Sequence, residues 1–391
     1  MLVFELLRII SAFQTFVISA NHHEGCAPCA CCRHLRHKGN PLRILTVLLA
    51  SACGASLMPA VNAQAIADAG IAPPPAPIVL EKIVVSGEQP GPGMWKVSKG
   101  EHVLWIVGTQ LPVPKKMTWR AKGVAAIVAQ SKEVLGEPSV SISAKKIGYF
   151  TSLWLLPSAM ESRKNPDGAT LKDIVPPEMY RRWEALRARY VGEYNINDEE
   201  NDMERWRPMF AALRLYRRAI DASGMSSTSP VWPVIREAAN RHGVKITEVK
   251  FEPDIVEPGA AIREFRASRL ADLECFSKTI ERIETDLTAM RSRANAWAVG
   301  DVDALRKLPA TDQRAVCETA IRNAPFMKTL GAQDLIAQVE SMWLNAAESA
   351  LGKNSVTLAV LPIAQLVSPA GYLAKLRMKG YLISEPDSAT E

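Results

Sequence analysis

The chain lacks a strong net charge, and it lacks the local motif of the common serine hydrolases. Its 391 residues include 47 Lys or Arg and 41 Asp or Glu, a formal net charge of +6, and from residue 64 onward the balance is only 42 to 39. So small and mixed an excess gives no reason to expect nucleic acid as a partner. No Gly-x-Ser-x-Gly motif, and no evident His and Asp partners, accompany Ser131, Ser139, Ser141 and Ser143.

Histidine and cysteine are scarce beyond residue 63, where only His102, His242, Cys275 and Cys317 occur. His102 is a candidate general base, but its place in an amphipathic hairpin favours a partly exposed strand residue. His242 precedes Gly243, a pair typical of a helix end. Two cysteines in an exported protein favour one disulfide, which would close a loop of roughly 40 residues and contribute roughly 3–4 kcal/mol. The alternative is two buried free thiols on helices.

Residues 1–63 have the pattern of a targeting segment. Three basic residues, Arg36, Lys38 and Arg43, precede the apolar run Ile44–Val61, which closes at Ala63. Basic, apolar and small-residue parts in this order are typical of a signal peptide. The sequence therefore predicts a cleaved signal and a periplasmic or secreted protein.

Two alternatives to a simple cleaved signal involve the same run. Cys53 is a candidate acylation site, which would make the protein a lipoprotein, although Ala50 stands where a lipobox prefers Leu. Gly54 and Pro59 interrupt the run, so a permanent membrane span is disfavoured.

A Cys/His-rich tract lies upstream of this signal. It contains His22, His23, Cys26, Cys29, Cys31, Cys32, His34 and His37. Such a tract resembles a zinc cluster. It lies between an apolar segment and a signal, without sequence for a small core around it. We favour an upstream extension, with true initiation near Leu35, and sequencing the N-terminus of the secreted form would test this.

The rest of the chain divides into a linker and one large domain. Residues 64–90 are Ala- and Pro-rich, with an edge strand at Ile83–Val85, and residues 91–385 form the predicted domain. Met94–Gly108 predicts a hairpin, because two β-branched and aromatic runs flank a Ser-Lys-Gly-Glu corner. An amphipathic helix over Trp119–Leu135 and a strand over Val140–Ile142 would complete a parallel βαβ unit.

The middle of the chain has the apolar spacing of helices, over a predicted insertion of about 151–350, with one strand within Val244–Phe251. Asp301 is a predicted N-cap of the helix Val302–Leu308. A helix, the strand Val356–Ile363, the helix Tyr372–Lys379 and the strand Tyr381–Ile383 then follow. The fold class is therefore α/β (α+β), with a mixed sheet built from both ends of the domain and a large helical insertion.

Three motifs resemble those of one known family. The hairpin begins Trp-Lys-Val and leads into Gly108-Thr109-Gln110-Leu111, Trp297–Asp301 reads Trp-Ala-Val-Gly-Asp, and Pro362–Tyr381 resembles a closing segment. Together they resemble the TraB/GumN family, to which the Tiki metalloproteases belong, over roughly residues 93–385. The resemblance implies a peptidase fold in which two Gly-x-x-His histidines, with acidic residues, hold a divalent metal.

Both motif histidines are replaced in this chain, by Leu111 and Gln365. Leucine offers no lone pair, and a neutral amide is a weak ligand for metals that imidazole suits. Glu137 and Glu252 occupy about the positions of the family's acidic residues, and carboxylates alone suit at best a loosely held ion. The candidate pocket therefore comprises Gly108, Thr109, Gln110, Leu111, Glu137, Glu252 and Gln365, with no cofactor expected.

Three functions remain open at this point. The first is a degenerate member of the peptidase fold that binds a peptide or envelope partner without hydrolysis. The second is an active hydrolase with a rearranged Mn, Co or Zn site that uses Glu137 or Glu252. The third is an envelope scaffold that presents the aromatic-rich helical insertion to a partner.

Overall fold

The computed structural model describes residues 88–141, 147–192, 199–255, 257–308, 313–329 and 334–386, without the side chains of residues 199–201. The predictions for residues 1–87, namely the signal peptide, Cys53, the Cys/His-rich tract and the edge strand at Ile83–Val85, lie outside the described residues. Ser143 also lies outside them.

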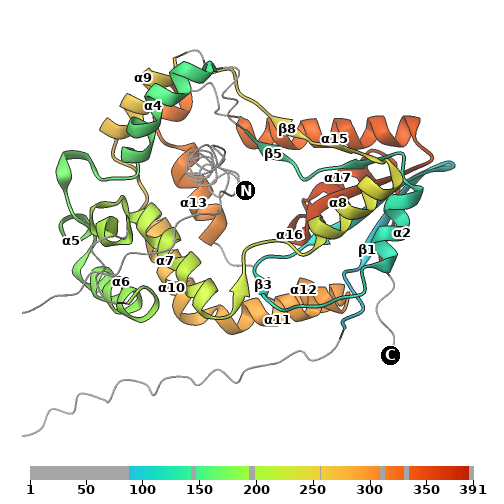
Figure 1. The fold of residues 1–391 in the computed structure, drawn as a ribbon, viewed down its shortest axis with the longest axis horizontal. Helices are drawn as coiled ribbons and strands as arrows, with labels where there is room; N and C mark the ends of the chain where they lie inside the picture. The colour runs from blue at the N-terminus through green and yellow to red at the C-terminus, as the bar shows by residue number, and fades with distance from the viewer. Residues whose placement is uncertain are drawn as a thin grey trace, which may run out of the picture. The chain divides into compact units, whose positions relative to one another are not determined.

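A six-stranded mixed sheet forms the centre of the fold (Figure 1), in the order β10-β1-β2-β9-β4-β7. Its strands are β1 (Met94–Lys99), β2 (His102–Thr109), β4 (Glu133–Leu135), β7 (Lys245–Thr247), β9 (Val356–Pro362) and β10 (Leu382–Ser384). The predicted hairpin is confirmed, because β1 and β2 pair antiparallel around a turn in which Gly100 has a φ of +59°. Glycine favours this left-handed conformation because it lacks a Cβ.

Strand β2 pairs in parallel with β9, which comes from the other end of the domain. Their register runs from Val103 opposite Val356 to Thr109 opposite Pro362. The five central residues of β9 are buried, as expected for a strand covered on both faces. The predicted α/β (α+β) class, with a mixed sheet formed by N- and C-terminal portions of the chain, is therefore confirmed.

The predicted helix Trp119–Leu135 is confirmed over Lys122–Gln130 and is wrong at both ends. Helix α2 (Lys122–Gln130) ends at Ser131, whose backbone is extended and whose hydroxyl donates to the Ile127 carbonyl at 2.7 Å. The chain then forms β4, which pairs in parallel with both β9 and β7. Val134 and Leu135 continue the apolar spacing of a helix, but pairing with strands distant in sequence determines their conformation.

Two small sheets accompany the central one. Where the strand Val140–Ile142 was predicted, the structure has β5 (Ser139–Val140), which pairs with β8 (Lys250–Phe251) outside the central sheet, and Ile142 lies outside the described residues. The predicted strand within Val244–Phe251 becomes β7 and β8. The second small sheet joins β3 (Val113–Pro114) to β6 (Met225–Ser226).

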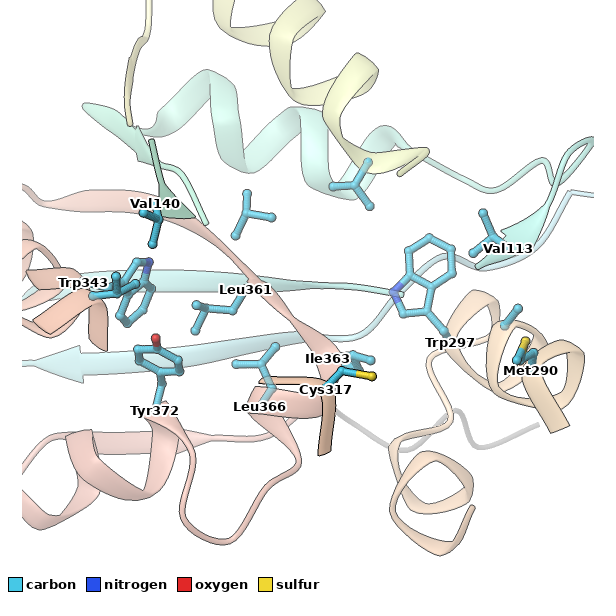
Figure 2. Packing of buried hydrophobic residues seen from close by; sticks show 14 of the residues in the cluster. Val113, Val140, Met290, Trp297, Cys317, Trp343, Leu361, Ile363, Leu366 and Tyr372 are labelled. Carbon is cyan, nitrogen blue, oxygen red and sulfur yellow. The ribbon is translucent and has the colours of Figure 1, made fainter. Parts of the chain in front are cut away.

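Helices make up the predicted insertion and the C-terminal region. They are α4 (Tyr149–Glu161), α5 (Leu171–Ile174), α6 (Pro177–Tyr190), α7 (Pro208–Ala222), α8 (Val231–His242), α9 (Pro258–Ala267), α10 (Leu273–Thr285), α11 (Leu287–Ala298), α12 (Val302–Lys307), α13 (Gln313–Arg322), α14 (Phe326–Thr329), α15 (Leu335–Lys353), α16 (Ile363–Leu366) and α17 (Tyr372–Met378), with short 3-10 turns at Pro166–Gly168 and Glu199–Arg205. Figure 2 shows that α16 and α17 lie on one side of the strands, with α2 and α8 on the other.

Helix α7 illustrates why the insertion is helical. Met209, Leu213, Tyr216 and Ile220 recur at steps of four, three and four, and all four are buried. Residues at this spacing share one face of a helix, so α7 buries a continuous apolar stripe, and its extensive contacts are with α10. The periodicity correctly predicted a core function for these side chains.

A disulfide joins Cys275 on α10 to Cys317 on α13. The predicted bond is confirmed, and the alternative of two free thiols is wrong. Both residues are buried, with 0% and 1% of their surface exposed. The bond ties together two helices separated by 42 residues in the chain.

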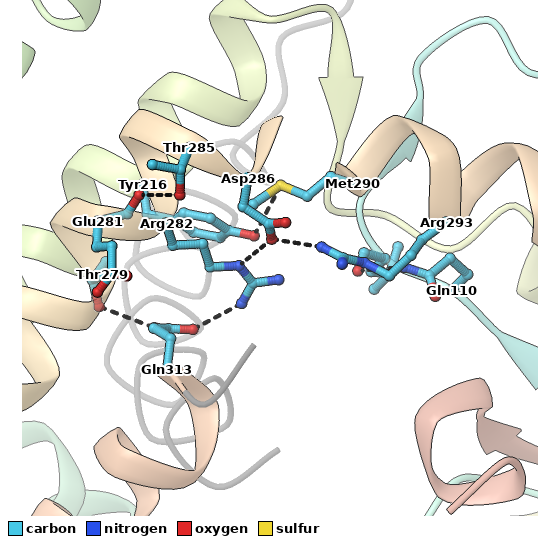
Figure 3. A network of polar contacts seen from close by, with 11 residues as sticks. Gln110, Tyr216, Thr279, Glu281, Arg282, Thr285, Asp286, Met290, Arg293 and Gln313 are labelled. Atoms are coloured by element: carbon cyan, nitrogen blue, oxygen red, sulfur yellow. Dashed lines mark hydrogen bonds and ion pairs between the residues drawn. The ribbon is translucent and has the colours of Figure 1, made fainter. Parts of the chain in front are cut away.

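A network of polar side chains links the same helices beside the disulfide (Figure 3). The buried Asp286 carboxylate accepts from Arg293 Nη2 at 2.5 Å and lies 3.4 Å from Arg282 Nε. Arg282 donates to Gln313 at 2.8 Å, and Gln313 donates to the Thr279 hydroxyl at 3.0 Å. Each buried charge is thereby paired, as low-dielectric surroundings require.

Within the described ranges, every helix is too short or too polar to cross a bilayer.

Candidate functional site

The candidate site lies where three parallel strands end. Strands β2, β9 and β4 lie side by side, and the register places Thr109 opposite Pro362 at their carboxyl ends. The two segments that stand in for the family's Gly-x-x-His motifs begin at Gly108 and Pro362, so both leave the sheet at this edge. Carboxyl ends of parallel strands are the usual place for ligands in α/β proteins.

Thr109 and Glu137 meet at this edge. The Thr109 hydroxyl donates to Glu137 Oε1 at 2.8 Å and lies 3.5 Å from the Leu361 carbonyl oxygen. Thr109 ends β2, and Glu137 follows β4, which lies on the far side of β9. The bond therefore crosses the end of β9 and brings together two residues of the predicted candidate pocket.

Two buried indoles fix the backbone on either side of this bond. Trp297 Nε1 donates to the Gly108 carbonyl at 2.8 Å, and Trp343 Nε1 donates to the Gly136 carbonyl at 3.1 Å. Figure 2 shows both indoles beside the strands, far apart along the sheet. Trp297 thus binds a carbonyl near the end of β2, and Trp343 binds a carbonyl just after β4.

The remaining residues of the Trp-Ala-Val-Gly-Asp motif are also structural. Gly300 has a φ of +74°, and a Cβ there would lie 3.4 Å from the Gly91 carbonyl oxygen and 3.3 Å from the Gly93 nitrogen. Asp301 accepts from the Ala304 backbone N–H at 2.8 Å, which confirms the predicted N-cap of α12. The motif thus anchors the start of the hairpin rather than contributing side chains to the strand edge.

Gln365 lies on the short helix α16, directly after β9. A Cβ at Gly371 would lie only 2.0 Å from the Gln365 carbonyl oxygen, so this turn requires glycine for close approach. The turn leads into α17, whose Tyr372 packs edge-on against Trp343 at 4.9 Å between ring centroids. Gly371-Tyr372-Leu373, the Gly-Tyr-Leu motif of the closing segment, therefore sets the position of Gln365.

A pocket with a volume of about 90 Å³ opens beside Gln365. Its lining combines apolar side chains with polar groups that can donate or accept: Pro138, Val140, Arg314, Glu318, Ile336, Val339, Glu340, Pro362, Gln365 and Tyr372. Sequence reasoning missed Arg314, Glu318 and Glu340, because charges on predicted helices are normally solvated. Tyr372 could have been identified from the sequence, because it belongs to the Gly-Tyr-Leu motif.

The polar groups of this pocket are held by ion pairs. Arg314 Nε lies 2.9 Å from Glu318 Oε1, one helical turn away on α13, and Lys375 forms an ion pair with Glu340. Burial and the Glu340 charge both raise the pKa of Tyr372, with Arg314 opposing them. Tyr372 therefore keeps its phenolic proton and can donate a hydrogen bond into the pocket.

The other predicted site residues are placed differently. Leu111 is 44% exposed, whereas Gln110 is buried and donates to the Leu111 carbonyl at 3.0 Å. Glu252 follows β8 in the small β5–β8 sheet. Strand β8 pairs with β5, which begins two residues after Glu137. Glu252 therefore lies farther than Glu137 from the ends of the central strands.

Neither histidine of the domain lies at the strand edge. His102 begins β2, at the opposite end from Thr109, where its Nδ1 lies 2.7 Å from the Asn354 carbonyl oxygen. His242 is the last residue of α8, and Gly243 follows it in the left-handed conformation with a φ of +67°. Both placements agree with the structural functions predicted for them.

A mixed sheet, a helical insertion and motif segments at the carboxyl edge define an α/β protein with a strand-end site. The chain belongs to the TraB/PrgY/gumN family, whose model matches residues 93–385. No curated protein and no solved structure matches the chain.

The donor set at the strand edge does not fit the metal centre that the family resemblance implies. Leu111 supplies no lone pair, Gln365 supplies a neutral amide, and the Glu137 carboxylate already accepts a hydrogen bond from Thr109. Among the described side chains, no group of three or more His, Cys, Asp or Glu residues is placed to hold a metal ion.

Proposed function

We propose that this family member is an exported protein that binds a peptide segment of an envelope partner at the strand-end site without hydrolysing it. The observation that carries the proposal is the pair Leu111 and Gln365 at the ends of adjoining strands, where the family places histidines. A site with an aliphatic side chain and an amide lacks a means to activate water through a metal. Binding remains, because the strand edge and its pocket are intact.

The size and lining of the pocket support a peptide as the ligand. A volume of about 90 Å³ corresponds to roughly three water molecules, well below the roughly 300–1,000 Å³ of drug-sized sites. Such a pocket suits one side chain of an extended chain. The Tyr372 hydroxyl, the Gln365 amide and the Arg314 guanidinium can hydrogen-bond to peptide groups around it.

An active hydrolase is the second candidate, because one observation favours it. The Glu137 carboxylate lies at the strand edge, in the position expected for an acidic residue of the family site. Metal-dependent turnover would then need ligands other than the motif histidines. Measurement of metal content in the tag-free protein and of EDTA-sensitive cleavage of peptides with Mn²⁺, Co²⁺ or Zn²⁺ separates the two candidates, and EDTA-sensitive turnover would overturn non-hydrolytic binding.

A matched pair of variants tests the peptide site. Ile336 lines the pocket and is 39% exposed, whereas Ile174 is 37% exposed on α5 and does not line it. Peptides selected from a random display library should be retained intact by the wild type and by Ile174→Trp. Ile336→Trp should weaken their binding by at least about tenfold, because an indole narrows the pocket. If both variants bind the peptides equally well, the peptides bind outside this pocket, as expected for an envelope scaffold.

Export is the remaining element of the proposal. The signal pattern that ends at Ala63 supports it, and lipid attachment at Cys53 is the alternative. Mass spectrometry of the N-terminus of the protein recovered from the periplasm or medium should find a mature chain that begins near Gln64. A mature protein that retains Cys26 to Cys32 would contradict this.

A further inference from the structure

Helix α4 carries an exposed apolar face that the proposed strand-end site does not use. Tyr149, Phe150, Leu153 and Trp154 are 68%, 82%, 64% and 83% exposed, and Pro157 is also exposed. At 100° per residue these five side chains fall within roughly 140° of the helix circumference. Elsewhere in the described chain, large exposed hydrophobic residues are scattered singly, as at Leu111, Ile174 and Met378.

The opposite side of α4 packs against α9. Leu155 approaches Gly259, where a Cβ would lie 3.6 Å from Leu155 Cδ2, and Arg266 Nη1 donates to Ser158 Oγ at 3.2 Å. Ser158 lies one helical turn after Trp154, so the Arg266 guanidinium borders the apolar face. Arg263 and Arg269 are also exposed on α9 and just after it. Arg266 therefore places a cationic side chain at one edge of the aromatic face, and Arg263 and Arg269 add exposed positive charge to the same segment.

We infer that this face of α4 docks the protein onto an anionic phospholipid bilayer. Trp, Tyr and Phe are the side chains suited to the interface between headgroups and acyl chains, and neighbouring arginines attract anionic headgroups. The segment Ile147–Met160 contains no charged residue. Glu161, the last residue of α4, falls within the same arc, and its carboxylate is paired with Lys164 Nζ at 3.0 Å. The helix lies in the membrane plane and does not span the bilayer.

A bilayer fits this face better than a second copy of the chain does. Stable protein interfaces bury roughly 1,200–2,000 Å² in total, which one convex helical face of five side chains does not supply. Shallow insertion of two aromatic side chains needs only the exposed surface of α4 itself.

Co-flotation of the full chain with lipid vesicles tests the inference. Vesicles of phosphatidylcholine with phosphatidylglycerol should bind the protein, and both omission of phosphatidylglycerol and high salt should weaken binding. Phe150→Ser with Trp154→Ser should reduce binding by at least about tenfold. The matched control is Met378→Ser with Leu382→Ser, since these residues are 80% and 72% exposed elsewhere and should leave binding unchanged.

Tryptophan quenching by brominated phosphatidylglycerol identifies the part of the chain that enters the bilayer. Of the nine tryptophans, Trp154 alone is exposed, and the others are buried or partly buried. Quenching should therefore be strong in the wild type and largely lost in Trp154→Phe, which should still float with vesicles. Equal flotation of the wild type and the Phe150/Trp154 variant would overturn the inference. The inference would also be overturned if the wild type self-associates and does not bind vesicles, and the Phe150/Trp154 variant abolishes this self-association.

Discussion

Single glycine and tryptophan residues determine where the strand-end site lies. Trp297 and Trp343 each satisfy one glycine carbonyl at the carboxyl end of a strand, and Gly371 lets α17 approach α16. None of these residues offers chemistry to a substrate. Their contribution is to position Thr109 and Gln365, so their loss should appear first as a loss of stability.

Gly371→Ala should destabilise the fold by about 1–3 kcal/mol, the usual cost of overpacking. Its φ of −79° suits alanine, so the cost comes only from a Cβ placed 2.0 Å from a backbone oxygen. Gly352→Ala is the matched control, because that glycine lies in α15 with no atom within 4 Å of its Cβ position. The control should be neutral or stabilise by up to about 1 kcal/mol in urea unfolding. Equal destabilisation by both would contradict the close approach.

Asp272 gives the fold a pH dependence of its own. Burial raises the pKa of Asp272 to about 6, from its ordinary value of 3.8, although the Met209 backbone N–H donates to its carboxylate and Arg207 lies nearby. The native state therefore holds a proton between pH 3.8 and about 6 that the unfolded chain has released. Stability from this group is greatest below the unfolded pKa and falls as pH rises, by about 3 kcal/mol in all.

Asp272→Asn should remove this dependence, because an amide oxygen can still accept from the Met209 N–H. Urea unfolding of the wild type and of the variant at a series of pH values measures the difference. The wild type should lose about 2 kcal/mol relative to the variant between pH 4 and 6.5. A constant difference across this range would show that the pKa of Asp272 is not raised.

At the scale of elements, the sequence predicted what local periodicity determines. The hairpin, α7, α15 and β9 each have one regular pattern of apolar residues over several turns or residues. The structure contains all four of these predicted elements. Strand β4 was missed because its three residues continue a helical spacing, and its conformation depends on β9 and β7, which are more than a hundred residues away. The pocket beside Gln365 was missed for the same reason, since α13 and α15 contribute charges that only tertiary packing brings there.

The disulfide between Cys275 on α10 and Cys317 on α13 should contribute substantially to stability. In the chain-entropy account, a cross-link over 42 residues stabilises by about 4 kcal/mol at 25 °C. Cys275→Ala with Cys317→Ala should therefore lower the urea midpoint, and so should treatment of the wild type with a thiol reductant. The same reductant should leave the double variant unchanged, which controls for the cysteines near the N-terminus. An unaltered midpoint in the reduced wild type would contradict this contribution.

At the scale of the whole molecule, the two ends of the domain complete one sheet. Strands β1 and β2 come from its beginning, and β9 and β10 from its end, with the helical insertion between them in sequence. Sequence alone identified Thr109, Leu111, Glu137 and Gln365 as one site through the family resemblance. The hydrogen bond from Thr109 to Glu137 across the end of β9 depends on strand order, which local patterns do not encode.

Because the register sets Thr109 opposite Pro362, positions 111 and 365 leave neighbouring strand ends, and the Glu137 carboxylate reaches Thr109 across the end of β9. Leu111→His with Gln365→His should therefore restore two imidazole ligands beside a carboxylate, a set that suits Zn²⁺ or Co²⁺. Titration calorimetry of tag-free protein should show affinity at least about tenfold above that of the wild type and of either single variant, since each of these lacks one imidazole. If the double variant binds metal no better than the single variants do, the two strand ends do not converge on one site, and the loss of histidines would not explain a loss of hydrolysis.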